Sequence, residues 1–241
     1  MIKMTIAFLT LFGIAMGYLE AAVVVYLRQI YYPEGFQFPL KIIALHGFSI
    51  EFFREISTII ILISIAFIAG KSFYMRFAYF LFCFGLWDIF YYFWLKVLLN
   101  WPPSLLTWDI LFLIPVVWAG PVMAPLICAI TMIVISVLIF SFQIKGLEVR
   151  IKPLEWFLLL CGSLIIFTSF IWNYGKLIIE GGFITRLHSL SSAPRFQEII
   201  STYIPELFNW PLFFSGELLI ISAIIMFYLR LSNQEHTYPE Y

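Results

Sequence analysis

Six stretches of the sequence are long and apolar enough to cross a lipid bilayer, and this feature limits the fold more than any other. A membrane-spanning helix needs about 20 mostly apolar residues. Stretches of this kind fall at residues 5–27, 49–69, 77–98, 110–142, 154–174 and 211–229. Because unpaired backbone groups are too costly in lipid, such stretches form helices. The sequence therefore predicts an all-α, polytopic transmembrane bundle of about six spans, with residues 1–241 forming a single integral membrane domain.

The composition excludes a soluble protein. Hydrophobic residues make up 63% of the 241 residues and charged residues only 12%, against about 45–50% and roughly 25% in ordinary globular proteins. Fourteen Lys and Arg balance fourteen Asp and Glu, so no basic excess points to nucleic acid. The expected partner is the lipid bilayer, and a further membrane subunit or a second copy of the chain are open alternatives.

The fourth stretch is too long to be one simple helix. As a continuous helix, residues 110–142 would extend about 50 Å, whereas the hydrocarbon core is about 30 Å thick. Pro115, Pro121 and Pro125 interrupt this stretch, and each proline removes a backbone donor. We predict a proline-broken segment that enters the bundle, followed by a true span over residues 122–142.

The distribution of Lys and Arg predicts the orientation. Short connections at 70–76 and 143–153 contrast with long ones such as 175–210, within which Arg195–Phe208 is expected to lie along the interface. Lys and Arg in short loops favour the cytoplasmic side. With the termini inside, that side carries Lys3, Lys71, Arg76, Lys145, Arg150, Lys152 and Arg230. We therefore expect a plasma (inner) membrane protein with both termini cytoplasmic.

Ionisable residues inside the predicted spans each need a reason, because placing one in a bilayer costs at least about 2.5–3.5 kcal/mol. Glu20 falls on the same helix face as Gly13, and Gly13-x-x-x-Gly17 is typical of closely packed membrane helices. Glu20 is therefore expected to point into the bundle. The second span opens with a polar stripe on one face, made of Glu51, Arg54, Glu55 and Thr58.

The third and sixth spans also carry acids. Asp88 lies near the middle of the third span, and Glu217 lies about two turns into the sixth. Tyr91 and Tyr92 flank Asp88 on its helix face, so we expect their phenols to donate hydrogen bonds to its carboxyl group.

These residues are predicted to share one half of the membrane. Successive spans run antiparallel, so the end of the first, the start of the second and the start of the sixth lie on the same side, which the proline-broken segment also enters. The candidate substrate- or ion-binding residues are Glu20, Glu51, Arg54, Glu55, Asp88, Tyr92, Asp109 and Glu217. Lipid headgroup contacts, helix-packing ion pairs and a protonated structural acid are simpler interpretations of individual members.

Three functions are consistent with such a group. The first is binding of a cation, a proton or a small substrate, as in a transporter, because carboxylates in a low dielectric require protonation or a bound cation. The second is an intramembrane acid–base or metal-assisted enzyme acting on a lipid or another apolar substrate, although no catalytic residue is identified. The third is a non-catalytic structural subunit. A hard divalent cation, if bound, would take oxygen ligands from Glu20, Glu55, Asp88 and Glu217.

The sequence identifies no cofactor. A haem held between membrane helices needs histidines inside the spans, but the three histidines lie outside the apolar stretches, at His46, His188 and His236. A disulfide framework or a zinc site of the CxxC type is also not expected, because the three cysteines fall in separate stretches, at Cys83, Cys128 and Cys161.

Overall fold

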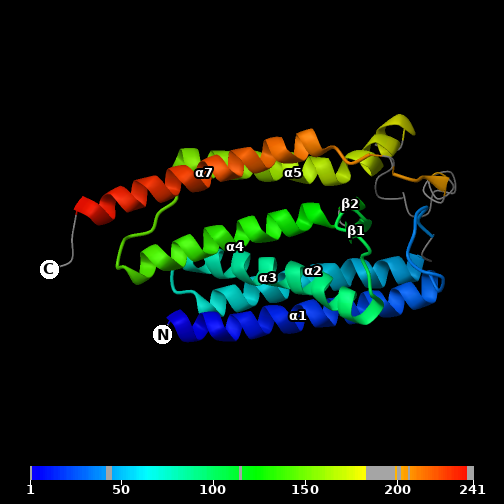
Figure 1. Cartoon of the computed structure of the whole chain (residues 1–241), viewed down its shortest axis with the longest axis horizontal. Coiled ribbons are helices and arrows are strands. Elements are labelled where there is room, and N and C mark those ends of the chain that lie inside the picture. The colour runs from blue at the N-terminus through cyan, green and yellow to red at the C-terminus, as the bar shows by residue number, and fades with distance from the viewer. Residues whose placement is uncertain are drawn as a thin grey trace.

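Six long helices dominate the computed structural model, which describes residues 2–41, 45–113, 116–182, 199, 202–205 and 207–237. The helices are α1 (Ile2–Tyr31), α2 (Leu45–Ala69), α3 (Phe73–Leu99), α4 (Met123–Ile144), α5 (Pro153–Glu180) and α7 (Trp210–Thr237) (Figure 1). Each is long and apolar enough to span a membrane. The predicted all-α transmembrane bundle is therefore confirmed, and the start of α1 and the end of α7 lie at the same end of it (Figure 1).

Helix boundaries follow backbone capping more closely than hydropathy, so most helices extend past the predicted apolar limits. The Ser72 hydroxyl accepts a hydrogen bond from the Met75 amide at the start of α3, and Asn100 ends that helix in the left-handed conformation. Pro153 begins α5, which continues to Glu180, several residues beyond the predicted span of 154–174. The expected interfacial helix over Arg195–Phe208 lies mostly outside the described residues.

The fourth apolar stretch is broken, as predicted, but the entering segment is a β-hairpin. Strand β1 (Trp108–Phe112) pairs antiparallel with β2 (Trp118–Pro121), and α4 begins at Met123. Two paired strands satisfy each other's backbone groups, which must remain bonded at membrane depth. Pro121 ends its strand, and Pro125 lies in the first turn of α4, where a helix needs no amide donor. Ile114 and Pro115 lie outside the described residues.

Glycines bring α1 and α3 into close contact. A Cβ atom on Gly13 would lie 2.7 Å from Leu86 Cβ, and one on Gly17 would lie 2.8 Å from the Phe90 backbone. This confirms the predicted packing role of the Gly13-x-x-x-Gly17 pattern. The pair α5 and α7 is joined in the same way, since Gly162 meets the backbone of Gly216.

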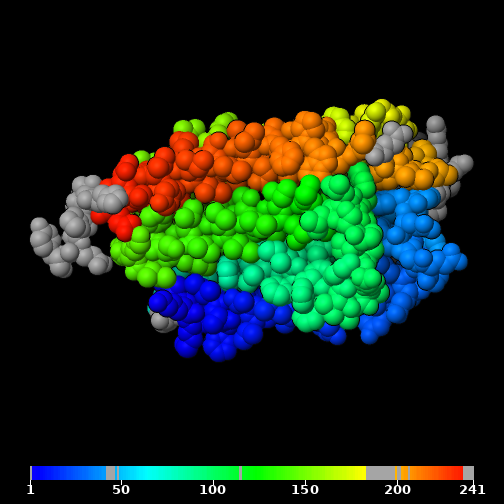
Figure 2. Space-filling model, in the orientation of Figure 1, coloured from blue at the N-terminus to red at the C-terminus, as the bar shows by residue number. Residues whose placement is uncertain are grey.

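The bundle consists of two groups of helices. Helices α1–α4 pack together, and α5 pairs with α7 along one side of them (Figure 1). On the face seen in Figure 2, α7 lies against α4 along much of its length. At the end opposite the termini, the hairpin connects the two groups through Trp118, whose ring lies 4.8 Å from that of Phe167. Nearer the termini, the rings of Phe77 and Trp156 lie 5.2 Å apart.

Candidate ion- and substrate-binding cavity

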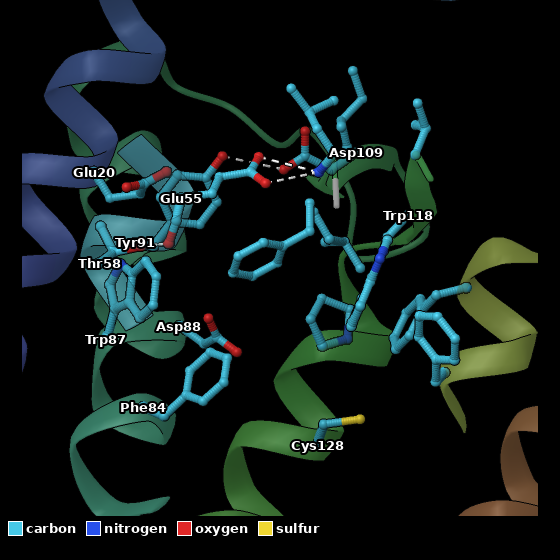
Figure 3. A pocket seen from close by; sticks show the side chains of 18 of the residues that line it. Glu20, Glu55, Thr58, Phe84, Trp87, Asp88, Tyr91, Asp109, Trp118 and Cys128 are labelled. Atoms are coloured by element: carbon cyan, nitrogen blue, oxygen red, sulfur yellow. Dashed lines mark hydrogen bonds between the residues drawn. The ribbon is translucent and has the colours of Figure 1, made fainter. Parts of the chain in front are cut away.

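A cavity of about 790 Å³ lies between the two groups of helices, beneath the hairpin. Its lining extends from Lys41, before α2, to Trp156 in the first turn of α5. This volume is in the range of small-molecule sites. All eight candidate residues from the sequence line it (several are labelled in Figure 3): Glu20, Glu51, Arg54, Glu55, Asp88, Tyr92, Asp109 and Glu217.

Arg54 holds two of the carboxylates in ion pairs. Its Nη1 lies 2.6 Å from Glu20 Oε2, and its Nε lies 2.7 Å from Glu51 Oε2. The Arg54–Glu20 pair joins α2 to α1, so the helix-packing interpretation applies to Glu20, whereas the Arg54–Glu51 pair lies within α2. Their charges are compensated by the guanidinium, which leaves these two acids less available to a ligand.

A second ion pair fixes the hairpin to α1. Arg28 Nη2 lies 3.0 Å from Asp109 Oδ1, and both side chains are buried. The guanidinium carbon also lies 3.8 Å from the ring centre of Trp101 and 4.7 Å from that of Phe36. Burial raises the pKa of Asp109 above the ordinary aspartate value, and the adjacent Arg28 opposes this shift.

The predicted hydrogen bonds to Asp88 are not formed. The Tyr91 hydroxyl donates to Asp109 Oδ2 at 3.4 Å, and the buried Tyr92 hydroxyl has no hydrogen bond to Asp88. The spacing of residues on α3 placed these phenols near Asp88. It could not reveal that the hairpin brings another carboxylate within their reach.

Three cavity-lining acids have no cationic partner in the described part of the chain: Glu55, Asp88 and Glu217. Both Glu55 oxygens accept from the Leu113 amide, at 3.0 and 3.1 Å. Glu217 Oε2 accepts from the Thr131 hydroxyl at 3.1 Å, whereas its Oε1 is buried without a hydrogen-bond partner. Asp88 has neither a hydrogen bond nor an ion pair within the described residues.

The charges around the cavity do not balance. Among the residues that the structure describes, its lining contains six carboxyl groups and three cations, the latter being Arg28, Lys41 and Arg54. If all were ionised, three negative charges would be in excess. A low-dielectric cavity strengthens the attraction of such an excess for a positive ligand. The three uncompensated acids come from three different helices, α2, α3 and α7, so they line the space from several sides; Glu55 and Asp88 are labelled in Figure 3.

The uncompensated acids do not form a compact metal site. Among the described residues, no three His, Cys, Asp or Glu side chains are arranged so that they could hold a metal ion. The set of Glu20, Glu55, Asp88 and Glu217 is therefore distributed around the cavity, and its members face the space separately.

Two important cavity residues were not singled out from the sequence. Arg28 continues the α1 face that carries Glu20 and Val24, at intervals of four residues. A predicted span ending at residue 27 left it in a loop. Thr131, which donates to Glu217, is a hydroxyl in an apolar helix, and only the packing of α4 on α7 shows its role.

A comparison of the chain with protein-family models, with curated proteins and with solved structures finds no match. The geometry and charge of the cavity are therefore the features that bear on function.

Proposed function

We propose that this multi-pass membrane protein binds a positively charged small molecule or ion in the cavity, in the manner of a transporter. The observation that carries the proposal is the position of Glu55, Asp88 and Glu217, which line one cavity and form no ion pair with a described Lys or Arg. Charges with no partner are costly in a membrane interior, and a functional ligand gives a reason for them.

The extent of the cavity supports transport over a purely structural role. The lining reaches from the hairpin residues Asp109 and Trp118 to Trp156 in the first turn of α5, which begins toward the end that holds the termini (Figure 1). Helix contacts alone would not require an open volume of this length. A binding space that runs along most of the bundle needs only a limited rearrangement to become accessible from the other side.

The aromatic contacts of Trp156 supply a closure at one end. Its ring centre lies 5.2 Å from that of Phe77 and 6.1 Å from that of Phe73. These ring contacts join α3 to α5 near the termini, so this state would receive a ligand from the side of the bundle or from the hairpin end. With both termini cytoplasmic in the plasma membrane, as the Lys and Arg distribution predicts, that end faces away from the cytoplasm.

Binding of radiolabelled tetramethylammonium to the full chain in lipid nanodiscs tests the proposal. We expect saturable binding that weakens at least about tenfold, or about 1.4 kcal/mol, in Asp88→Asn and in Glu217→Gln. Glu55→Gln keeps an acceptor for the Leu113 amide, so it should reduce binding more than stability. Glu180→Gln removes an exposed charge and is the matched control.

Two results would contradict the proposal. One is an absence of saturable tetramethylammonium binding to the well-folded protein. The other is unchanged affinity in both Asp88→Asn and Glu217→Gln. Uptake of the same cation into proteoliposomes, compared with protein-free vesicles, then separates transport from binding alone.

A further inference from the structure

The part of the cavity nearer the termini is apolar. We call it the apolar chamber and define it as the space between Phe77, Leu81 and Phe84 of α3 and the facing side of α5. These three aromatic and aliphatic side chains recur at helical spacing on one face of α3. The helix α5 presents a matching stripe at intervals of three and four residues: Trp156, Leu160, Ser163, Phe167, Phe170 and Tyr174.

The opposite face of α5 is already occupied. Gly162 packs so closely on α7 that an added Cβ would lie 2.7 Å from the Gly216 carbonyl oxygen. The stripe lies beside this contact and lines the cavity, and its member Phe170 also contacts α7, with its ring 5.9 Å from that of Phe213. Most of its members are large apolar side chains, a surface suited to a hydrocarbon chain.

The chamber opens at the side of the bundle. Leu160 lines the cavity and is 64% exposed, and Ser163, one turn further, is also exposed. Extensive packing of α5 involves α7 and the hairpin strand β2, and does not extend along α2 or α3. For a membrane protein, an apolar opening on this surface faces the acyl chains of the bilayer.

Two acidic side chains lie at the boundary of the chamber that faces the hairpin. Asp88 is one turn from Phe84 on α3 and lies beside it in Figure 3. Glu217 is 3% exposed, and its unpartnered Oε1 belongs to the same cavity wall. A ligand whose apolar part occupies the chamber would thus place its other end next to uncompensated carboxyl groups.

We infer that the ligand is a cationic amphiphile, which places a positively charged head at Asp88 and Glu217 and a hydrocarbon tail in the apolar chamber. This inference rests on the proposed function and specifies its substrate class. The side opening lets such a molecule enter from the bilayer, where amphiphiles concentrate. Each methylene that leaves water adds a favourable contribution to binding, so the tail should determine much of the affinity.

Displacement of radiolabelled tetramethylammonium by dodecyltrimethylammonium tests the inference, because the two cations share a head and differ in one chain. The full protein is used in nanodiscs, at amphiphile concentrations that leave the discs intact. Ser163→Phe fills the chamber, whereas Ser222→Phe places the same ring on an exposed position of α7 that does not line the cavity. Leu160→Trp and Leu164→Trp form a second pair, since Leu164 is exposed and outside the cavity lining.

We expect Ser163→Phe and Leu160→Trp to weaken binding of the dodecyl cation at least about tenfold, while tetramethylammonium affinity changes less than about twofold. Ser222→Phe and Leu164→Trp should bind both cations as the unmodified protein does. Partition into the bilayer is the same for all variants, so it cannot produce this difference. Unchanged dodecyl affinity in both chamber variants overturns the amphiphile inference but not the proposed function. Failure of tetramethylammonium itself to bind overturns both.

Discussion

Removing either partner of the Arg28–Asp109 pair should destabilise the protein by several kcal/mol. The two groups lie 3.0 Å apart, and their side chains are only 9% and 3% exposed. At an effective dielectric of about 20 and a charge separation of about 4 Å, their attraction is about 4 kcal/mol. This agrees with the about 3–5 kcal/mol typically lost when one partner of a buried pair is truncated. Trp101 adds a cation–π contact to the guanidinium.

A double-mutant cycle measures this interaction. Arg28→Met and Asp109→Leu are each expected to lower the free energy of unfolding in mixed micelles by about 3–5 kcal/mol. The double variant should be more stable than the sum of these losses predicts, because it leaves no unpaired buried charge. The exposed pair Glu148–Arg150 is the control, with an expected coupling of about 0–1 kcal/mol. Additive losses at Arg28 and Asp109, or single losses below about 1 kcal/mol, would show that the two buried charges do not stabilise each other.

Other expected outcomes concern packing and orientation. Gly17→Ala should destabilise the bundle by about 1–3 kcal/mol, because the added Cβ would meet the Phe90 backbone. Gly175→Ala is the control and should be neutral or stabilising, because no atom lies within 4 Å of its added Cβ. Thermal unfolding in detergent compares the two variants. Arg230→Met leaves buried Glu155 without its bidentate partner, so it should lower stability while cation affinity is retained. A reporter fused after Tyr241 should report a cytoplasmic location, and an external signal would contradict the predicted orientation.

The membrane spans were predictable from the sequence because lipid imposes one solution on a long apolar stretch. The orientation of Glu20 was also predictable, since Gly13 and Gly17 identify the packed face of α1. The hairpin was not. Prolines show where a helix must stop, but whether the freed backbone pairs with another strand depends on residues that come together only in the fold.

The distribution of ion pairs could not be read from spacing either. Arg54 has Glu51 and Glu55 within one turn, yet it pairs with Glu51 and with Glu20 from α1. Glu55 is instead directed to the Leu113 amide, which the hairpin brings to it. The sequence indicated which acids share a region, whereas tertiary contacts determine which of them remain uncompensated.

Chemical labelling of the carboxyl groups tests most directly whether uncompensated acids receive a cation in the cavity. Dicyclohexylcarbodiimide is a hydrophobic reagent that modifies carboxyl groups in membrane interiors, and peptide mass spectrometry locates the modified residues. We expect modification at Asp88 and Glu217, slowed by tetramethylammonium, with the ion-paired Glu20 and Glu51 reacting less. In Asp88→Asn, tetramethylammonium should no longer slow the modification of Glu217. Modification of Glu20 and Glu51 in preference to Asp88 and Glu217, or labelling that the cation leaves unchanged, would show that these acids do not receive a cation.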